Sequence, residues 1–361
     1  MKKLGRAFLV LAAGSSLGLA LVASAAGTTA AHSKQVKHLQ QPVGALAVDG
    51  NYVAYDLNNQ AQTTATDKVR VWNVRTGQTV TVSGKKTAAA GGVGGDGVFQ
   101  LAIAGSRVAW LVNEGGNLES TDFLFSSSVT QPKERQVASA LRSGDGGCSG
   151  RDPVGCTGAW LGGLVGSGNT IALNRWTTDA TGHMGSGGLY TLSGTQMKPV
   201  ATGTSTVQAV ASAGGREAVL RADGSVAVYS ASGAVLATVN PPSAIAAALS
   251  GPNLIVLTKT RQILAYNSYT GSLGKTIAVH GKGPQNLDIE RNIAIYTTGS
   301  VVHAVNLSSG RNNVIGTAAN RITFARIDSA GLAYSSNGVR ANFGKSTLVF
   351  VPTSRFKRLV R

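Results

Sequence analysis

The chain has few acidic, aromatic and sulfur-containing side chains. Its 361 residues include 16 Asp and Glu against 33 Lys and Arg, which gives a net charge of +17, and aromatic residues make up 6% of it. A calcium cage needs about six to eight oxygen ligands, for which so few carboxylates offer little material. The low aromatic content and the lack of a recognisable binding module argue against nucleic acid. We therefore expect no metal, no cofactor and no nucleic-acid partner.

Cysteine is almost absent, and the two that occur, Cys148 and Cys156, have seven residues between them. In an oxidising compartment, such an isolated pair is typical of a disulfide that closes a small loop. Zinc binding is the alternative, but a zinc site needs four nitrogen or sulfur ligands and no His lies near this pair. The sequence therefore predicts a Cys148–Cys156 disulfide.

Long hydrophobic runs are confined to the N-terminus. A basic stretch at residues 2–6 precedes the apolar residues 7–23, which lead into Ala23-Ser24-Ala25. Basic, apolar and small-x-small segments in this order are the pattern of a cleaved secretory signal peptide. The alternative is an uncleaved anchor, but the run contains Gly and Ser and is short for a membrane span of about 20 residues. We interpret residues 1–25 as a signal peptide of a secreted protein, extracellular or periplasmic.

Helical periodicity is also missing from Val43 onward, where short apolar or alternating runs are broken by Gly, Asn, Asp and Ser. Five turns share a small residue followed by Gly: Thr76-Gly77, Ser193-Gly194, Ser232-Gly233, Thr270-Gly271 and Ser309-Gly310. The last four of these glycines are 39, 38 and 39 residues apart. A period near 40 built from strands is typical of β-propeller blades, each a four-stranded sheet.

The repeats predict an all-β, seven-bladed β-propeller with four-stranded antiparallel blades over residues 43–361, after an N-terminal tail at residues 26–42. Residues 356–360 are assigned to the outer strand of the last blade. A pair of β-sandwiches would also show short, regularly spaced strands, but the near-constant period favours the propeller. Stacking around a channel lets neighbouring blades bury faces that one sheet alone would expose. We expect a monomer.

Two of the repeats carry a family resemblance. The segments VRVWNVRTG and ILAYNSYTG resemble the strand-and-turn signature shared by WD-repeat and quinoprotein-type propellers, and the repeat style covers nearly all of residues 43–361. The Gly-His pair and structural Asp of true WD repeats are missing, as is the tryptophan-docking pattern of quinoprotein dehydrogenases. The resemblance therefore implies a fold and does not imply an activity.

Catalytic motifs are absent or weak. No Ser lies in a Gly-x-Ser-x-Gly elbow, and no helix pattern follows the glycine-rich residues 92–97 to complete a phosphate-binding loop. Asp288 and Glu290 are two apart in one expected strand, so their side chains project to the same side. We interpret them as ion-paired with Arg291 or Arg326. No catalytic residue is predicted.

The longest connections gather on one face and on consecutive blades. In a propeller, the loops between the second and third strands and the loops between blades emerge on the same face. The long ones belong to blades 7, 1, 2 and 3, at residues 58–67, 83–96, 113–119, 141–157, 177–187 and 337–345. Loops on a rigid scaffold commonly carry binding residues, although drift in surface loops also costs little stability.

This long-loop face supplies the candidate binding residues, namely Lys85, Lys86, Arg142, Arg151, Asp152, Asp179 and His183. The disulfide would constrain the loop around Arg151 and Asp152. We expect an exported, non-enzymatic binding scaffold that recognises an envelope protein or an anionic polymer through this face. The alternative is a carbohydrate- or peptide-directed lyase or hydrolase with its site in the central funnel. A convergent cluster of His, Asp, Glu or Tyr at the channel mouth would favour the enzyme, and a lining of Gly, Ala, Ser and Thr the scaffold.

The leader yields the first testable prediction. Mass spectrometry of the secreted protein should show a new N-terminus at or near Ala26, because the signal peptidase recognises the preceding small residues. Recovery of the intact form beginning at Met1 from the membrane fraction would contradict cleavage.

Overall fold

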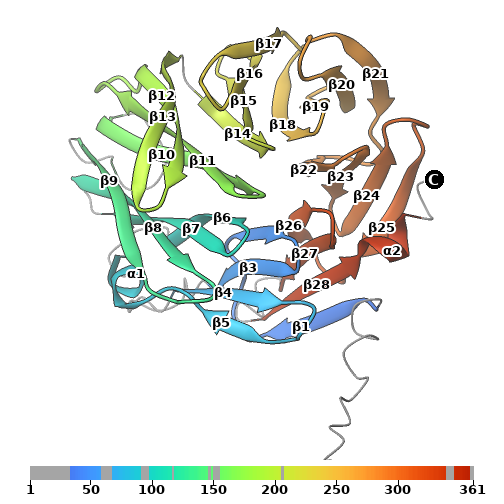
Figure 1. Cartoon of the computed structure of the whole chain (residues 1–361), viewed down its shortest axis with the longest axis horizontal. Coiled ribbons are helices and arrows are strands. Elements are labelled where there is room, and N and C mark those ends of the chain that lie inside the picture. Colours follow the sequence, from blue (N-terminus) through green and yellow to red (C-terminus); the bar gives the residue numbers. More distant parts are fainter. Residues whose placement is uncertain are drawn as a thin grey trace, which may run out of the picture.

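The computed structural model describes residues 33–57, 67–90, 97–115, 118–144, 148, 155–204, 207–338 and 345–357. These residues form antiparallel β-sheets arranged as blades around a central axis (Figure 1). Two short helices, α1 (Lys85–Ala90) and α2 (Thr353–Phe356), accompany the strands. None of the helices in the described residues is long and apolar enough to cross a membrane.

The strands follow one another as consecutive meanders, and each set of four is called a blade below. Blade 1 contains β2 (Leu46–Asp49), β3 (Tyr52–Leu57), β4 (Lys68–Asn73) and β5 (Thr79–Thr81). Blade 2 contains β6 (Gly97–Ala104), β7 (Arg107–Gly115), β8 (Glu119–Ser128) and β9 (Arg135–Ser143). Blade 3 contains β10 (Thr157–Ser167), β11 (Thr170–Thr178), β12 (Met184–Ser193) and β13 (Gln196–Thr204).

Blades 4 to 6 have shorter strands. Blade 4 contains β14 (Val207–Ala213), β15 (Arg216–Arg221), β16 (Val226–Ser230) and β17 (Val235–Val239). Blade 5 contains β18 (Ala244–Ser250), β19 (Asn253–Thr258), β20 (Gln262–Asn267) and β21 (Leu273–Ala278). Blade 6 contains β22 (Gln285–Glu290), β23 (Ile293–Thr298), β24 (Val301–Asn306) and β25 (Asn312–Thr317). Blade 7 contains β26 (Ile322–Ile327), β27 (Gly331–Asn337), β28 (Ser346–Pro352) and β1 (Gln35–Leu39).

The first strands of the blades surround the axis. They contact one another in cyclic order, from β2 through β6, β10, β14, β18, β22 and β26 and back to β2. Blades 2 and 3 are hydrogen-bonded into one eight-stranded sheet, because β9 pairs with β10 at Thr157–Ser143 and Gly158–Arg142. Divided at this junction, the described strands give seven four-stranded blades, the number that the sequence repeats predict.

The hydrophobic core is divided among the blade interfaces. One cluster joins Val71 of blade 1 to Trp110 and Phe125 of blade 2, and further clusters lie between each later pair of blades. Another joins blade 7 to blade 1, so the ring of interfaces closes. In middle strands such as β15, the four central residues are all buried. In the outer strand β21, most residues are exposed. Covering both faces of a middle strand explains its continuous apolar sequence.

A recurring turn explains the Gly repeat. The side-chain carbonyl oxygen of Asn73, and equally of Asn267 and Asn306, accepts hydrogen bonds from the backbone two and three residues later. The glycine that follows has a positive φ of 76° at Gly77 and 71° at Gly271, a conformation that disfavours a side chain. The Asn-x-x-Thr/Ser-Gly pattern therefore fixes the turn between the third and fourth strands.

Ring closure differs from the sequence-based prediction. The outer strand of blade 7 is β1, which pairs antiparallel with β28, for example at Val36–Val349. The outer strand was predicted at residues 356–360. Phe356 is instead the last residue of α2, and residues 358–361 lie outside the described residues. The tail predicted at residues 26–42 thus contributes a strand, because β28 has a free edge that only a distant segment can fill. Joining the chain's two ends within one sheet closes the ring.

The closure yields a second prediction. A chain that begins at Gln41 lacks β1, and with it the packing of Leu39 against blade 7 and the bond between the side chain of Lys37 and Thr79. We expect the free energy of unfolding to fall by roughly 3 kcal/mol, from reduced apolar burial and from missing hydrogen bonds worth about 1 kcal/mol each. Urea unfolding checks this against a control chain that begins at Ser33 and keeps β1. Equal stability of the two chains would show that β1 does not close the ring.

Candidate functional site

The central channel is a cavity of about 470 Å³ that is bordered by all the inner strands. Small side chains make up much of its wall, including Ala47, Gly166, Ala211, Ala213, Ala246, Ala247 and Ser250. Strands that converge on an axis leave little room for larger side chains. Gly, Ala and Ser make up 11 of the 25 lining residues, so the lining has only in part the composition that favours a scaffold.

One sector of the channel nevertheless carries carboxylates, from the last residues of β2 and β22 and from the residue after β26. Asp49, Glu290 and Asp328 line the cavity there, in the consecutive blades 1, 6 and 7. Burial is the main cause that raises the pKa of each, to about 7 for Asp328, and the charge of Asp49 raises the pKa of both others. Asp328 is thus partly protonated at neutral pH.

These carboxylates are already engaged by the fold. The Asp328 side chain accepts a hydrogen bond from the backbone N–H of Gly50 in the next blade, and Asp49 accepts one from Gly105 in the blade after that. Glu290 is paired with Arg291, with 3.4 Å between Oε1 and Nε. Among the described residues, no three His, Cys, Asp or Glu side chains are placed to hold a metal ion. The carboxylates of this sector therefore serve mainly to connect neighbouring blades, and they are not free acids.

A smaller pocket of about 300 Å³ adjoins this sector between blades 6 and 7. Glu290 and Asp328 line both cavities, and Arg291, Phe356 and Lys357 complete the outer wall. The pairing of Glu290 with Arg291 is the ion pair expected from the sequence. Asp288 instead accepts the backbone N–H of Ile327, at 2.9 Å, and Arg326 lowers the pKa that burial raises.

Another buried carboxyl, Glu217, lies behind Ser212, which lines the central channel. It is 1% exposed in β15, and burial raises its pKa to about 8. The group is therefore mostly neutral at pH 7, although the formal charge of the chain counts it as negative. The folded state favours the protonated form of Glu217. The stability that this preference contributes is lost as pH rises through about 8.

Lys85 and Lys86 open α1, which lies at the outer rim of the ring between blades 1 and 2 (Figure 1). Both side chains are exposed, as predicted. The carboxylate of Glu134 accepts hydrogen bonds from the backbone N–H groups of Gly84, Lys86 and Thr87, at 2.7, 3.0 and 3.2 Å. This capping holds the two lysines at the rim, away from the channel.

Asp179 and His183 stand in the tight turn between β11 and β12. The Asp179 carboxylate accepts the backbone N–H of His183 at 3.0 Å and the hydroxyl of Thr181 at 2.6 Å, and the latter bond chiefly lowers its pKa. The Nδ1 of His183 lies 3.8 Å from Asp179. Both side chains are exposed, so this turn offers a small polar contact element. Arg151 and Asp152 lie outside the described residues.

Arg142 does not lie on an exposed loop, and that expectation is wrong. It belongs to β9, is 1% exposed, and pairs with Asp122 at 2.9 Å between Nη1 and Oδ2. The strand continues to Ser143, so side chains alternate between faces and Leu141 takes the exposed side. The sequence-based loop boundary was set too early, which turned a core residue into a surface one.

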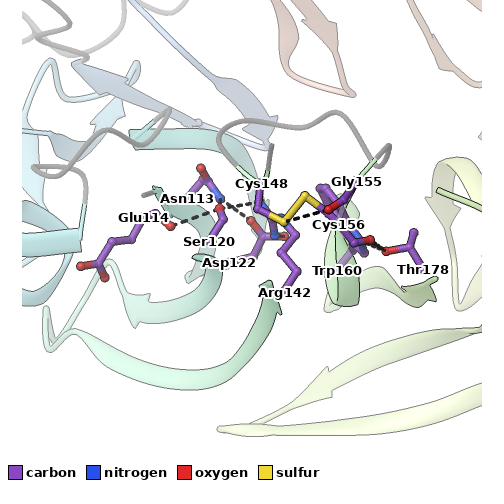
Figure 2. Close-up of a disulfide and its surroundings, with 10 residues drawn as sticks. All are labelled: Asn113, Glu114, Ser120, Asp122, Arg142, Cys148, Gly155, Cys156, Trp160 and Thr178. Atoms are coloured by element: carbon purple, nitrogen blue, oxygen red, sulfur yellow. Dashed lines mark hydrogen bonds and ion pairs between the residues drawn. A yellow bond between two sulfur atoms is a disulfide. The ribbon is translucent and has the colours of Figure 1, made fainter. Parts of the chain in front are cut away.

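A polar network surrounds this ion pair beneath the disulfide (Figure 2). Ser120 accepts a hydrogen bond from Arg142 at 2.9 Å, and Asn113 donates to both Ser120 and Asp122. Asp122 also accepts the backbone N–H of Leu161 from the next blade at 3.2 Å. The network thus joins blades 2 and 3 at the point where β9 pairs with β10.

The confirmed Cys148–Cys156 disulfide covers an aromatic stack. The Arg142 guanidinium lies 3.8 Å from the ring centre of Trp160, which stacks on Trp176 at 6.0 Å. The Trp160 indole N–H donates to Thr178, whose hydroxyl donates to the carbonyl of Cys156 at 2.6 Å. Sequence reasoning missed this cluster. Its signal is the alternation of Ser120 and Asp122 along β8, facing a basic residue on β9.

Above this network the ends of the strands expose apolar side chains. Leu118 is 63% exposed, Leu141 55% and Met184 40%. The carbonyl of Leu118 accepts the backbone N–H of Gly144 at 3.0 Å, so the start of β8 and the end of β9 lie together. We call Leu118, Leu141 and Met184 the apolar tip. It belongs to blades 2 and 3 on the long-loop face.

Comparison with known proteins supports the fold. No known family profile matches the chain, and no curated protein sequence is similar to it. The WD40 β-propeller domain of Doa1 is similar in structure, with a TM-score of 0.55 and 11% identity over 90% of this chain and 99% of that one. BamB from Moraxella catarrhalis gives a TM-score of 0.47 at 12% identity, over 86% of each chain. The computationally designed Ika8 protein gives 0.49 at 14% identity, over 86% of this chain and 97% of that one.

The chain therefore has a β-propeller fold that resembles WD40 propellers, as the sequence predicts. A likeness at such low identity carries the architecture alone. It assigns no ligand and no role to this chain.

The buried ion pair generates a third prediction. Asp122→Asn leaves the Arg142 charge buried without its partner, which typically costs about 3–5 kcal/mol. Urea unfolding followed by fluorescence of Trp160 and its neighbours measures this destabilisation. Glu290→Gln is the matched control, because Arg291 is largely exposed and such pairs contribute about 1 kcal/mol or less. Equal effects of the two substitutions would contradict a structural role for the Arg142 pair.

Proposed function

We propose that the protein is an exported, non-enzymatic scaffold that recognises an envelope protein or an anionic polymer through the long-loop face of blades 7, 1, 2 and 3. The apolar tip favours a protein partner on this face. The observation that carries the proposal is the exposure of Leu118 and Leu141 on adjoining strand ends. Export is inferred from the leader at residues 1–25.

Single exposed apolar residues are common on protein surfaces, whereas adjoining ones that project from a rigid base are typical of interaction sites. Strands of blades 2 and 3 reach 9 to 11 residues, compared with 6 for most strands of blades 5 and 6. We infer from these lengths that this end of blades 2 and 3 extends beyond the turns of the blades with shorter strands. Exposed apolar side chains at such a position gain free energy when a partner removes them from water.

The network beneath the apolar tip supports the same function. Arg142 and Asp122 tie β9 to β8, and the disulfide fixes the connection to β10. A surface that is already ordered loses less conformational entropy on binding. The Asp179–His183 turn lies next to Met184 and adds charge beside the apolar tip, and the exposed lysines of α1 add charge at the rim between blades 1 and 2. Charged groups at the edge of an interface mainly steer association.

The enzymatic alternative has one specific observation in its favour, the carboxylate sector of the channel. Asp328, with a pKa of about 7, could exchange a proton near neutral pH. However, Asp49 and Asp328 both accept backbone N–H bonds from neighbouring blades, and Glu290 is ion-paired. Removal of the Asp49 or Asp328 carboxylate would break a bond between blades, which is the behaviour of structural groups.

Photo-crosslinking on cells tests the proposed function. A photoreactive amino acid at position 119, next to Leu118, should crosslink to a discrete envelope protein. Leu118→Ser with Leu141→Ser should weaken binding about a hundredfold and so largely remove this product, because the partner no longer buries two apolar side chains worth about 1.5 kcal/mol each. The matched control is Val235→Ser with Leu273→Ser, which removes equally exposed apolar residues from blades 4 and 5. Crosslinking that falls equally in both variants, or is absent from the wild type, would contradict the proposal.

A further inference from the structure

A second surface, far from the apolar tip, is strongly cationic. It consists of Lys259, Arg261, His280, Lys282 and Arg321, which we call the basic strip. All five side chains are exposed. They come from the β19–β20 turn of blade 5 and from the connections that lead into blades 6 and 7. These connections share the face of the long loops but belong to blades with short turns.

Hydrogen bonds hold the basic strip together. The carbonyl of Arg261 accepts the backbone N–H of Val279 at 2.9 Å, and its guanidinium donates to the carbonyl of Gly281 at 3.4 Å. The Arg321 guanidinium donates to the side chain of Gln285 at 2.8 Å. The β19–β20 turn is thus joined to the connection between blades 5 and 6. The start of blade 6 is joined in turn to the connection between blades 6 and 7.

The position of Arg261 is conformationally demanding. Its φ of 61° is in the left-handed region, which Gly or Asn adopts more readily than Arg. The backbone there is fixed by the bond from Arg261 N–H to the Thr258 carbonyl at 3.0 Å. The ring of His280 is likewise placed, edge-on to the ring of His303 with centroids 6.5 Å apart. These cations are presented by ordered turns.

No ion pair among the described residues involves the basic strip. Between Asp223 and Asp328 the sequence contains only Asp288 and Glu290 as acids, and both line the central channel. The ion pairs found among the described residues join Arg142 to Asp122, His183 to Asp179 and Arg291 to Glu290. None of them involves the basic strip, so its charges reinforce one another and attract anions.

We propose that the basic strip binds a linear polyanion with closely repeated phosphate groups. Its cations belong to three successive connections and extend along the surface without enclosing one point. A single small anion can contact one or two of them, whereas a chain of repeated charges can contact all. Binding of such a chain releases its counterions, which is the main source of affinity for a polyanion. The surface is separate from the apolar tip and does not rest on the proposed function.

Binding of fluorescently labelled long-chain polyphosphate by the mature protein tests this inference. The strip variant combines Lys259→Ser, Arg261→Asn, Lys282→Ser and Arg321→Ser, with Asn chosen to suit the left-handed backbone. It should bind about tenfold more weakly or worse. The slope of log K against log salt should also become shallower by about 0.7–0.9 for each phosphate group that the variant no longer neutralises.

The control variant removes the same charge from exposed positions on the opposite face, with Arg75→Ser, Lys133→Ser, Lys198→Ser and Arg355→Ser. It should bind within about twofold of the wild type, since it removes only charge that lies beyond a Debye length of roughly 8 Å. Lys282→Ser alone should already weaken binding, which keeps the test valid if the strip variant is unstable.

Three results would overturn the inference. The first is equal weakening in the strip and control variants, which would indicate a response to net charge alone. The second is competition by inorganic phosphate at the same phosphate concentration as the polymer, which would indicate a single-anion site. The third is unchanged binding by the strip variant. Failure of the apolar-tip crosslink would leave this outcome unaffected, so the two proposals can fail separately.

Discussion

The structure depends on covering both faces of every middle strand. Strands such as β15 and β19 are buried along almost their whole length, so each sheet requires a neighbour on either side. A row of such sheets ends in two uncovered apolar faces unless it closes on itself. Closure in turn demands that blade 7 pack on blade 1, and β1 completes blade 7 from the other end of the chain. Small residues on the inner strands follow from the same requirement, because closure brings these strands together at the axis.

Four of the scarce carboxylates lock this ring. Asp328 and Asp49 accept N–H groups of the next blades, Asp288 accepts Ile327, and Asp122 accepts Leu161. Acids placed at blade interfaces are unavailable to balance surface cations. Glu217, held neutral by burial, contributes even less negative charge than its formal count. An acid-poor chain that places its acids inside therefore presents a more cationic surface than composition alone indicates.

The fold separates two surfaces of different chemistry on one face. Blades 2 and 3 have long strands, a buried ion pair and a disulfide, and they expose the apolar tip. Blades 5 and 6 have short strands and tight turns, and they carry the basic strip. The separation follows from the ring, because each blade contributes its own connections and contacts only its neighbours. The protein partner and the polyanion that we propose would therefore not compete for one surface.

Sequence alone determined the all-β class, the repeat, the turns and the disulfide, because each rests on local chemistry. The conformation of a Gly after Asn-x-x-Thr depends only on the residues of its own turn. The alternation of apolar residues likewise depends only on the strand that contains them. Sequence could not assign β1 to blade 7, bury Arg142 against Asp122 or gather the basic strip, since each joins residues that are distant along the chain. Arg142 is read as a surface charge until two strands bring it face to face with Asp122 out of water. Only the tertiary structure decided which charges are buried and which remain to meet a partner.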